Sequence, residues 1–162
     1  MPKTGIHWYR HGLRLHDNPS LFACQDEVER FAPIFIFDGK SAGTEICGYN
    51  RFRFLLQSLK DLEEQYSTFG IKFFCFHGQP HDILERLIKE WDVKVISFEK
   101  DSEAIWTKRD NLVKEVCKKH NIQVIEYVSH TLYDPEDIFN LNNNIPPNTI
   151  EDLIKICAKI GQ

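Results

Sequence analysis

The sequence lacks the glycine patterns of the common nucleotide-binding loops. Its eight glycines form neither G-x-G-x-x-G after the first apolar run nor G-x-x-x-x-G-K-[ST] anywhere. In those motifs the loop backbone cradles phosphate groups. Gly39, Gly43 and Gly48 follow the second apolar run without a neighbouring Lys-Ser/Thr pair, so loop flexibility explains them better than phosphate binding. Dinucleotide and P-loop functions of the usual kind are therefore disfavoured.

Positive charge, long apolar runs and paired cysteines are also scarce. The net charge of -4 lacks the basic excess of a duplex-binding module, so nucleic-acid binding by this chain is disfavoured. No apolar run has membrane-spanning length and the N-terminus has no signal-like apolar region, which predicts a soluble protein that is not secreted by the usual signal. The five cysteines are widely spaced, without Cys-x-x-Cys, which predicts buried, reduced thiols in a cytosolic or nuclear protein.

Signatures of metal binding and catalysis are missing as well. His77 and His81 are four residues apart, but Gly78 and Pro80 interrupt any helix between them. There is no G-x-S-x-G, and no cysteine has a local catalytic signature. We therefore predict neither a metal site nor catalytic residues. The tryptophans at 8, 91 and 106 lie on apolar sides of predicted elements, which favours core packing over electron transfer.

What is present is an alternation of apolar strands and amphipathic helices over one domain's length of chain. Because short strands alternate with longer helices, we expect an α/β fold with a doubly wound, five-stranded parallel sheet, Rossmann-like. The predicted strands are 5–10, 31–37, 71–76, 93–98 and 122–127, and the helices between them are 19–28, 49–69, 80–91 and 103–120.

Apolar spacing predicts the buried faces of these helices. Gly70 is a natural residue to follow the helix 49–69, and Pro33 is expected at the start of its strand because it cannot donate a ladder hydrogen bond. The predicted inward side chains are Phe52, Leu55, Leu56, Leu59, Leu62 and Tyr66 on the helix 49–69, and Ile105, Leu112, Val113 and Val116 on the helix 103–120.

The regular alternation stops after the fifth strand. Asp134-Pro135 begins a short turn or helix, and a helix over 149–160 has a capping-box-like Thr149-x-x-Asp152. Its apolar residues Ile150, Leu153, Ile154, Cys157 and Ile160 lie on one side. We expect residues 1–134 to form the α/β domain and 135–162 to begin a connection to a further domain.

Two charged loops are predicted to meet at the crevice of the sheet. If strands one and four are neighbours, the loop from Arg10 to Asn18 lies beside the loop from Glu99 to Glu103. Together they offer Arg10, Arg14, Glu99, Asp101 and Glu103, which suits a planar heterocycle with polar edges. The alternative is that Arg10 and Arg14 pair with Asp17, Asp38 or Glu103 and simply lock the loops.

Three segments resemble the cryptochrome/photolyase family, and most closely the light-sensing cryptochromes of insects. The stretch WYRHGLRLHDNPSL (8–21) is similar to the first signature of animal cryptochromes and (6-4) photolyases. The segment 35–62 contains IFDGKSAG and GYNRFRFLLQSLKDL, and 129–135 reads SHTLYDP. The motifs occur in the family's order along nearly the whole chain.

The resemblance implies the N-terminal α/β domain of a two-part flavoprotein, with the five strands of the sheet in the order 3-2-1-4-5. In the family a larger helical domain holds FAD, so we expect no stable FAD binding by this chain alone and a fragment or natural short isoform. A second, antenna chromophore, a folate or deazaflavin, lies in the α/β domain of photolyases. By resemblance its crevice here is lined by Arg10, Gly12, Leu13, Arg14 and Glu103.

The resemblance further implies a blue-light receptor that acts in circadian clock regulation and is not an enzyme. The expected partners are the protein's own C-terminal helical domain and clock proteins, and the expected location is cytoplasm and nucleus. Two alternatives stay open. One is a fragment of a (6-4) DNA photolyase, which repairs DNA in light after base flipping. The other is a free-standing nucleotide-binding α/β protein, which predicts tight ligand retention by these residues alone.

Overall fold

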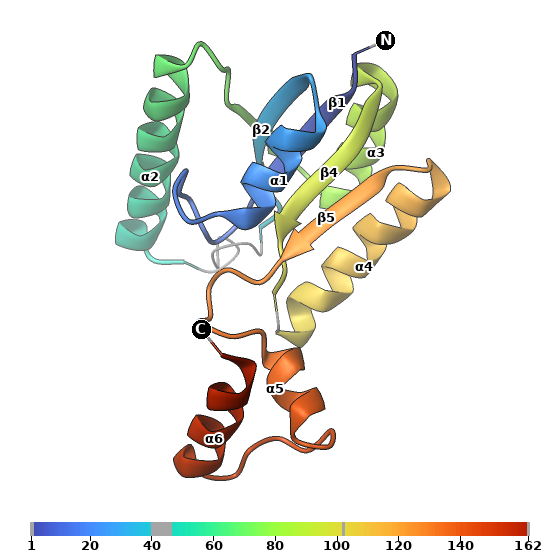
Figure 1. Cartoon of the computed structure of the whole chain (residues 1–162). Coiled ribbons are helices and arrows are strands. Elements are labelled where there is room, and N and C mark those ends of the chain that lie inside the picture. The colour runs from blue at the N-terminus through green and yellow to red at the C-terminus, as the bar shows by residue number, and fades with distance from the viewer. Residues whose placement is uncertain (1, 40–46, 102, 162) are drawn as a thin grey trace. The chain divides into compact units, whose positions relative to one another are not determined.

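The computed structural model describes residues 2–39, 47–101 and 103–161. The chain divides into two compact units, residues 1–127 and 128–162. The first contains a five-stranded sheet in the order β3-β2-β1-β4-β5 with every neighbouring pair parallel, which confirms the predicted fold class and strand order (Figure 1). The domain boundary predicted at residue 134 remains a prediction; the compact units divide the chain between Tyr127 and Val128.

The elements of the first unit follow the predicted alternation. The strands are β1 (Thr4–Tyr9), β2 (Arg30–Phe37), β3 (Phe74–His77), β4 (Val93–Glu99) and β5 (Gln123–Tyr127). The helices are α1 (Pro19–Glu27), α2 (Tyr49–Thr68), α3 (Pro80–Trp91) and α4 (Ala104–Lys119). The loop predicted between β2 and α2 falls largely on residues 40–46, which lie outside the described part of the chain.

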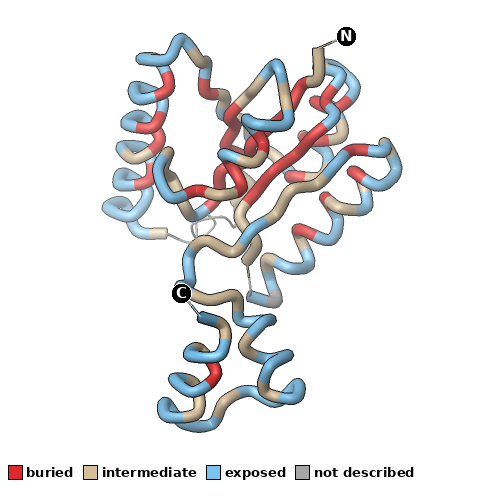
Figure 2. Tube along the Cα trace, viewed as in Figure 1, coloured by how far each residue is buried: buried red, intermediate tan, exposed pale blue. Residues whose placement is uncertain are grey.

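Each face of the sheet has its own apolar core. Strand alternation sends Ile6 and Trp8 of β1 toward α3 and α4, where Leu84 and Val113 complete the packing. Tyr9 and Phe35 belong to the core on the opposite face, with Leu21 of α1 and a row from α2. The buried segments in Figure 2 accordingly run through the strands and along the inner sides of the helices.

Strand β3 starts later than the predicted 71–76. The chain leaves α2 through Gly70, which has φ +68°, and the amide of Ile71 donates to the carbonyl of Tyr66. This is the reversal that commonly ends a helix at glycine. Because the residues after α2 are used by that turn and by the core beneath it, sheet pairing begins only at Phe74, opposite Ile34.

Pro33 lies inside β2 and not at its start, which corrects the prediction. It is buried and pairs in register with His7 of β1. Pairing with β3 begins one residue later, at Ile34. At Pro33 the strand therefore has a neighbour on the β1 side only, and a missing N–H toward the open side leaves no ladder acceptor unsatisfied.

The predicted inward faces of α2 and α4 are only partly buried. Leu55, Leu59, Leu62 and Tyr66 of α2 are in the core, but Phe52 and Leu56 are exposed. On α4, Val113 is buried, whereas Ile105 and Leu112 are exposed. The helices are amphipathic as predicted, but the sheet covers only part of the apolar side of each helix.

The cysteines and tryptophans are also less buried than predicted. All five cysteines are free, but only Cys24 and Cys117 are buried, and Cys75 is exposed on the edge strand β3. Burial raises the pKa of the Cys24 and Cys117 thiols to about 11. Trp8 is fully buried and Trp91, half-buried, packs against the core, while Trp106 is half-buried against His11 and Arg109.

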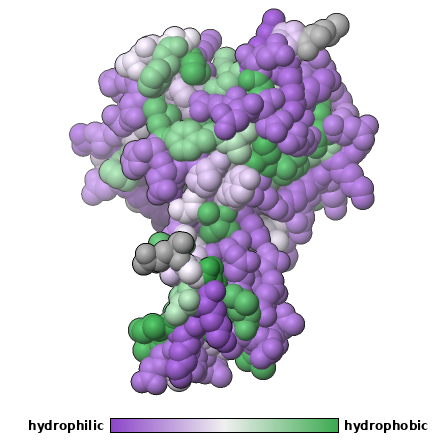
Figure 3. All heavy atoms as spheres, in the orientation of Figure 1, coloured by the Kyte–Doolittle hydropathy of each residue, from purple (hydrophilic) through white to green (hydrophobic). Residues whose placement is uncertain are grey.

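The second unit consists of the helices α5 (Pro135–Leu141) and α6 (Ile150–Ile160). The Asp134 and Thr149 side chains cap them, as the Asp-Pro and Thr-x-x-Asp patterns predict. The apolar side predicted for α6 is largely uncovered: Ile150 and Ile154 are exposed, and the buried residue of the helix is Ile156. Figure 3 shows hydrophobic side chains at the surface of this unit.

No helix in the described residues is long and apolar enough to cross a membrane.

Candidate functional site

The carboxyl ends of β1 and β4 lie side by side where the strand order reverses. The two predicted loops, 10–18 after β1 and 99–103 after β4, therefore begin at the same edge of the sheet, as the sequence predicts. The first loop reaches α1 through Asp17, which has φ +50°, and Asn18, whose side chain accepts the amide hydrogen of Leu21. This cap fixes where the loop ends.

Arg10 lies beneath the crevice rather than in it. The residue is 3% exposed, and its Nη1 donates to Oδ1 of Asp110 on α4 at 2.5 Å. The guanidinium also lies 5.1 Å from the Trp8 ring and 4.9 Å from the Phe98 ring. Arg10 thus forms an ion pair that holds its loop in place, as the alternative prediction states. Its partner is Asp110, however, and not Asp17, Asp38 or Glu103.

Arg109 extends this buried charge cluster toward the surface. Its Nη2 donates to Asp110 Oδ1 at 3.1 Å, and its Nη1 lies 3.7 Å from Asp38 Oδ2. Its guanidinium sits 4.9 Å from the Trp8 ring and 4.8 Å from the Trp106 ring. Two arginines and two aspartates therefore balance in charge, which is the condition for keeping them away from water. Burial lowers the pKa of Arg109, and Asp110 and Asp38 act in the opposite direction.

Two buried donors in this cluster have no hydrogen-bond partner within the described chain. They are the indole Nε1 of Trp8 and the Nε of Arg10. Trp8 lies in β1 and Arg10 directly follows that strand, with the Arg10 guanidinium 5.1 Å from the Trp8 ring. An unsatisfied buried donor is costly, so the aromatic and ionic contacts around these groups must outweigh that loss.

Gly12 and Arg14 form the rim of the crevice with Glu99. A Cβ added at Gly12 would lie 2.9 Å from Glu99 Oε2 and 3.6 Å from Arg14 Nη1, so a larger residue would displace the Glu99 carboxylate. Arg14 donates from Nε and Nη2 to the carbonyl of Asp17, and its Nη2 lies 3.8 Å from Asp17 Oδ2. The predicted pairing of Arg14 with Asp17 is therefore confirmed.

Leu13 belongs to the opposite face of the sheet. It packs against the core of α1 and α2, near Tyr9. Its amide donates to the carbonyl of His11, which turns the chain sharply after Gly12. Leu13 and Arg10 thus extend to different cores, and the structure does not bring these two predicted site residues together.

Glu103 lies at the exposed start of α4, on the second loop. Its amide donates to Oδ1 of Asp101, and the Asp101 carboxylate also approaches His11 Nε2 at 3.6 Å. The His11 ring is 5.1 Å from the Trp106 ring. Burial lowers the pKa of His11, and Asp101 opposes that change. Glu103 is exposed at the start of α4, and Asp101 therefore connects its loop to His11.

A buried polar network holds β1, β4 and the cap of α1 together. His7 Nδ1 is 2.7 Å from Ser97 Oγ, and His7 Nε2 is 3.3 Å from Asn18 Nδ2. Burial, with a smaller contribution from Arg10, lowers the pKa of His7 to about 3. The imidazole is therefore neutral at physiological pH, and the network sets the position of the first loop without titrating.

The hollow that opens from this cluster is small. It has a volume of about 190 Å³ and is bounded by Asp38, the Gln79–His81 turn and the Trp106 side of α4. Ligand pockets usually measure roughly 300–1,000 Å³. This hollow is therefore smaller than a folate or deazaflavin site, and none of the five predicted site residues lines it.

Sequence reasoning missed Asp110, Arg109 and Trp106 as parts of this site. Asp110 lies one helical turn before Val113 and two turns before Cys117, both buried, so it is a charged residue on an inward face. That pattern signals a buried ion pair. The described residues hold no cluster of His, Cys, Asp or Glu suited to a metal ion. The ion pairs and hydrogen bonds described here hold the two loops in place.

Comparison with known proteins identifies the family. The model of the DNA photolyase family matches residues 5–162. Cryptochrome-1 of Aedes aegypti is 42% identical over 100% of this chain and 31% of its own length. Cryptochrome-1 of Drosophila melanogaster is 44% identical over 98% and 30%, and that of Mus musculus is 39% identical over 99% and 26%.

Solved structures share the fold. A cryptochrome of Synechocystis has a TM-score of 0.82 at 22% identity, over 98% of this chain and 34% of its own. A class III photolyase of Agrobacterium tumefaciens has a TM-score of 0.83 at 19% identity, over 100% and 32%. The chain spans less than a third of the length of the curated relatives above. The motifs, the sheet order and these matches agree, and the chain belongs to the cryptochrome/photolyase family.

Proposed function

We propose that this chain is the N-terminal α/β part of a cryptochrome, a blue-light receptor flavoprotein that acts in circadian clock regulation. The observation that carries the proposal is the match to cryptochromes of insects and mammals along essentially all of the chain. The identity to the two insect proteins exceeds that to the mouse protein, in line with a light-sensing insect type.

In this proposal FAD is held by a helical domain outside these residues. In support of this, Arg10 is buried and already paired with Asp110, so its charge is not available to a cofactor. FAD, where the whole protein binds it, supplies light absorption and electron transfer. The residues of this chain contribute a rigid α/β unit, and the exposed apolar side of α6, with Ile150 and Ile154, is the surface we assign to the helical domain.

An antenna folate or deazaflavin would contact only some of the five predicted residues directly. Glu103 is exposed and Arg14 is half-buried, so these two side chains are available at the rim. Gly12 allows close approach of the loop to Glu99, while Arg10 and Leu13 hold the loop from the two cores. We therefore assign contact to Glu103 and Arg14, and positioning to the other three.

The whole protein is further proposed to work in the cytoplasm and nucleus, where it binds a clock protein after illumination and promotes its turnover. The free state of all five cysteines is in keeping with a reducing compartment. The competing function is light-driven repair of DNA by a (6-4) photolyase, which the family match also favours. Base flipping into a pocket would then be performed by residues outside this chain.

The deciding experiment uses protein expressed from a reading frame that continues past residue 162. We expect bound flavin that blue light reduces, and no restoration of a duplex carrying a (6-4) lesion. Repair of that duplex would establish the photolyase instead. The 162-residue chain, purified alone, should carry far less than stoichiometric flavin absorbance, and a full equivalent would show that FAD binds here.

The antenna assignment is tested on the 162-residue chain by titrating reduced folate and, separately, a deazaflavin. Glu103→Ala should weaken binding about tenfold, the effect of one charged hydrogen bond. Glu115→Ala is the matched control, since it removes an exposed carboxylate from the same helix. Equal affinity for Glu103→Ala and the wild type would remove Glu103 from the site.

A further inference from the structure

One exposed face of α2 has a pattern that the fold of a single copy does not explain. From Tyr49 the residues of this face recur in steps of three and four along the helix. Its members are Tyr49, Phe52, Arg53, Leu56, Lys60, Glu63, Glu64 and Ser67, all exposed. Tyr49 is 76% exposed, Leu56 46% and Phe52 39%. We refer to these eight residues as the α2 stripe.

The charges of α2 are separated along its axis. Arg51, Arg53 and Lys60 are the charged residues of its first twelve positions, and Asp61, Glu63 and Glu64 are those of the remainder. The first turn contains no acidic residue and the last turn no basic one. This order runs against the helix dipole, which favours acidic residues at the N-terminus and basic ones at the C-terminus. The stability of the isolated helix therefore does not account for it.

When the α2 stripe is laid on its own reverse, the opposite charges of Arg53 and Glu63 come together twice. Its positions are symmetric about residue 58, so that reversing the helix places Arg53 opposite Glu63, Leu56 opposite Lys60 and Tyr49 opposite Ser67. Neither Arg53 nor Glu63 forms a salt bridge within the described residues, while Lys60 and Glu64 pair weakly at 3.7 Å. A surface that matches its own reverse is what a two-fold contact requires.

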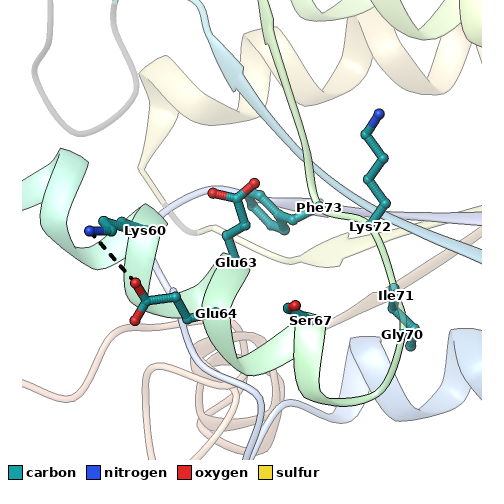
Figure 4. A pocket seen from close by; sticks show the side chains of 8 residues that line it. All are labelled: Lys60, Glu63, Glu64, Ser67, Gly70, Ile71, Lys72 and Phe73. Carbon is teal, nitrogen blue, oxygen red and sulfur yellow. Dashed lines mark ion pairs between the residues drawn. The ribbon is translucent and has the colours of Figure 1, made fainter.

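A hollow lies where the reversed Tyr49 would arrive. Figure 4 shows it between the last turns of α2 and the segment that leads to β3: Lys60, Glu63, Glu64 and Ser67 form one wall, and Gly70–Phe73 the other. Its volume is about 560 Å³, and Ile71 and Phe73 give it an apolar lining. An aromatic ring with a polar tip fits such a surface.

We propose that the α2 stripe is an antiparallel, two-fold interface between two copies of this chain. The Tyr49 ring of each copy enters the hollow of the other, Arg53 pairs with Glu63 across the interface on both sides, and the Leu56 side chains pack near the axis against the Lys60 stems. A helix of 20 residues is about 30 Å long, so the contact belongs to the small, reversible class. The dimer is weak, concentration-dependent and sensitive to salt.

The test is sedimentation velocity of the 162-residue chain from about 10 to 500 µM, at low and high salt. The wild type should shift toward dimer with concentration. Arg53→Glu and Glu63→Arg should each raise the dimer dissociation constant about tenfold or more, because each sets like charges opposite each other twice. Glu115→Arg, which makes the same charge change on an exposed position of α4, is the control and should leave dimerisation unchanged.

The mixture of the two variants separates this geometry from other causes of lost association. In a heterodimer of Arg53→Glu with Glu63→Arg, both cross-interface pairs are again of opposite sign. An equimolar mixture should therefore dimerise while each variant alone stays monomeric, and circular dichroism should show that both are folded. A wild type that is monomeric throughout the range, or a mixture that fails to associate, overturns the proposal.

Discussion

At the scale of single residues, the structure around the crevice depends on buried arginine charges that a neighbouring aspartate neutralises. Arg10 and Arg109 both donate to the Asp110 carboxylate, and their guanidinium groups lie against the rings of Trp8, Phe98 and Trp106. Removing one member of a buried ion pair leaves the other charge desolvated, which costs more than the pair itself contributes. Asp110 is therefore the residue on which this end of the sheet depends most.

We expect Asp110→Asn to lower the free energy of unfolding by about 3–5 kcal/mol, because two buried guanidinium groups lose their shared anion. Urea unfolding followed by circular dichroism measures this change. Asp17→Asn is the control: Asp17 pairs with Arg14 at the surface and is 83% exposed in its side chain, so its effect should stay under about 1 kcal/mol. Equal effects of the two variants would contradict the role of Asp110.

The buried His7 predicts a defined pH dependence of stability. Its pKa is lowered to about 3 by burial and, less, by Arg10, whereas an unfolded histidine titrates near 6.5. Between these values the unfolded chain binds the proton and the native protein does not. The free energy of unfolding therefore rises with pH through this window, and His7 weakens the fold by up to about 1.4 kcal/mol for each unit that the pH falls below about 6.

The contribution of His7 is isolated by comparison with His7→Asn, which keeps a polar group near Ser97 and Asn18 but cannot titrate. Urea unfolding of both proteins between about pH 4 and 7 should give a shallower pH dependence for the variant, by close to one proton. Parallel curves would mean that His7 is not neutral in the native protein.

At the scale of elements, the approach of α1 to the sheet depends on the small residue in β1. A Cβ at Gly5 would lie 2.7 Å from Val28 Cγ1 and 3.0 Å from Cys24 Sγ. Because Gly5 lets α1 approach closely, Asn18 at its N-terminus can reach His7. The position of the first loop is thus tied to the distance between α1 and β1.

We predict that Gly5→Ala destabilises the protein by about 1–3 kcal/mol, since the added methyl group forces α1 outward or Val28 from its rotamer. Thermal unfolding reports the change. Gly48→Ala serves for comparison, because no atom lies within 4 Å of a Cβ built there; it should cost under about 1 kcal/mol, as an altered helix cap. A harmless Gly5→Ala would show that α1 is not closely packed on β1.

At the scale of the whole molecule, the chain is two compact units with different degrees of burial. The first has continuous cores on both faces of its sheet, whereas the second buries Ile156 and leaves Ile150 and Ile154 exposed. Small units with little buried apolar surface have little stability of their own. We therefore expect the second unit to have less stability of its own than the first.

Limited proteolysis tests this difference. A protease of broad specificity should cut first within residues 128–162 and leave a resistant fragment close to 1–127, because cleavage follows local opening. Mass spectrometry of the products locates the cuts. Early cleavage within β1 or β4, with the second unit intact, would contradict the prediction that the second unit is the less stable of the two.

The sequence by itself determined the order of strands and helices, the caps at Asn18, Asp134 and Thr149, the turn at Gly70, and the family through its motifs. These features depend on neighbours within a few positions, which the chain presents directly. The strand order of the sheet was also predicted, because the motifs identify a family whose fold has that order.

Only the tertiary structure decided the roles of the site residues and the exposed faces. Arg10 is paired with Asp110, a hundred positions away, Pro33 is tolerated because β3 begins beside Ile34, and Phe52 and Leu56 remain outside the core. Apolar periodicity shows which side of a helix faces inward, but the width of the covered stripe depends on the sheet it meets. Partners distant in sequence are set by the packing of whole elements, and that information is absent from any local pattern.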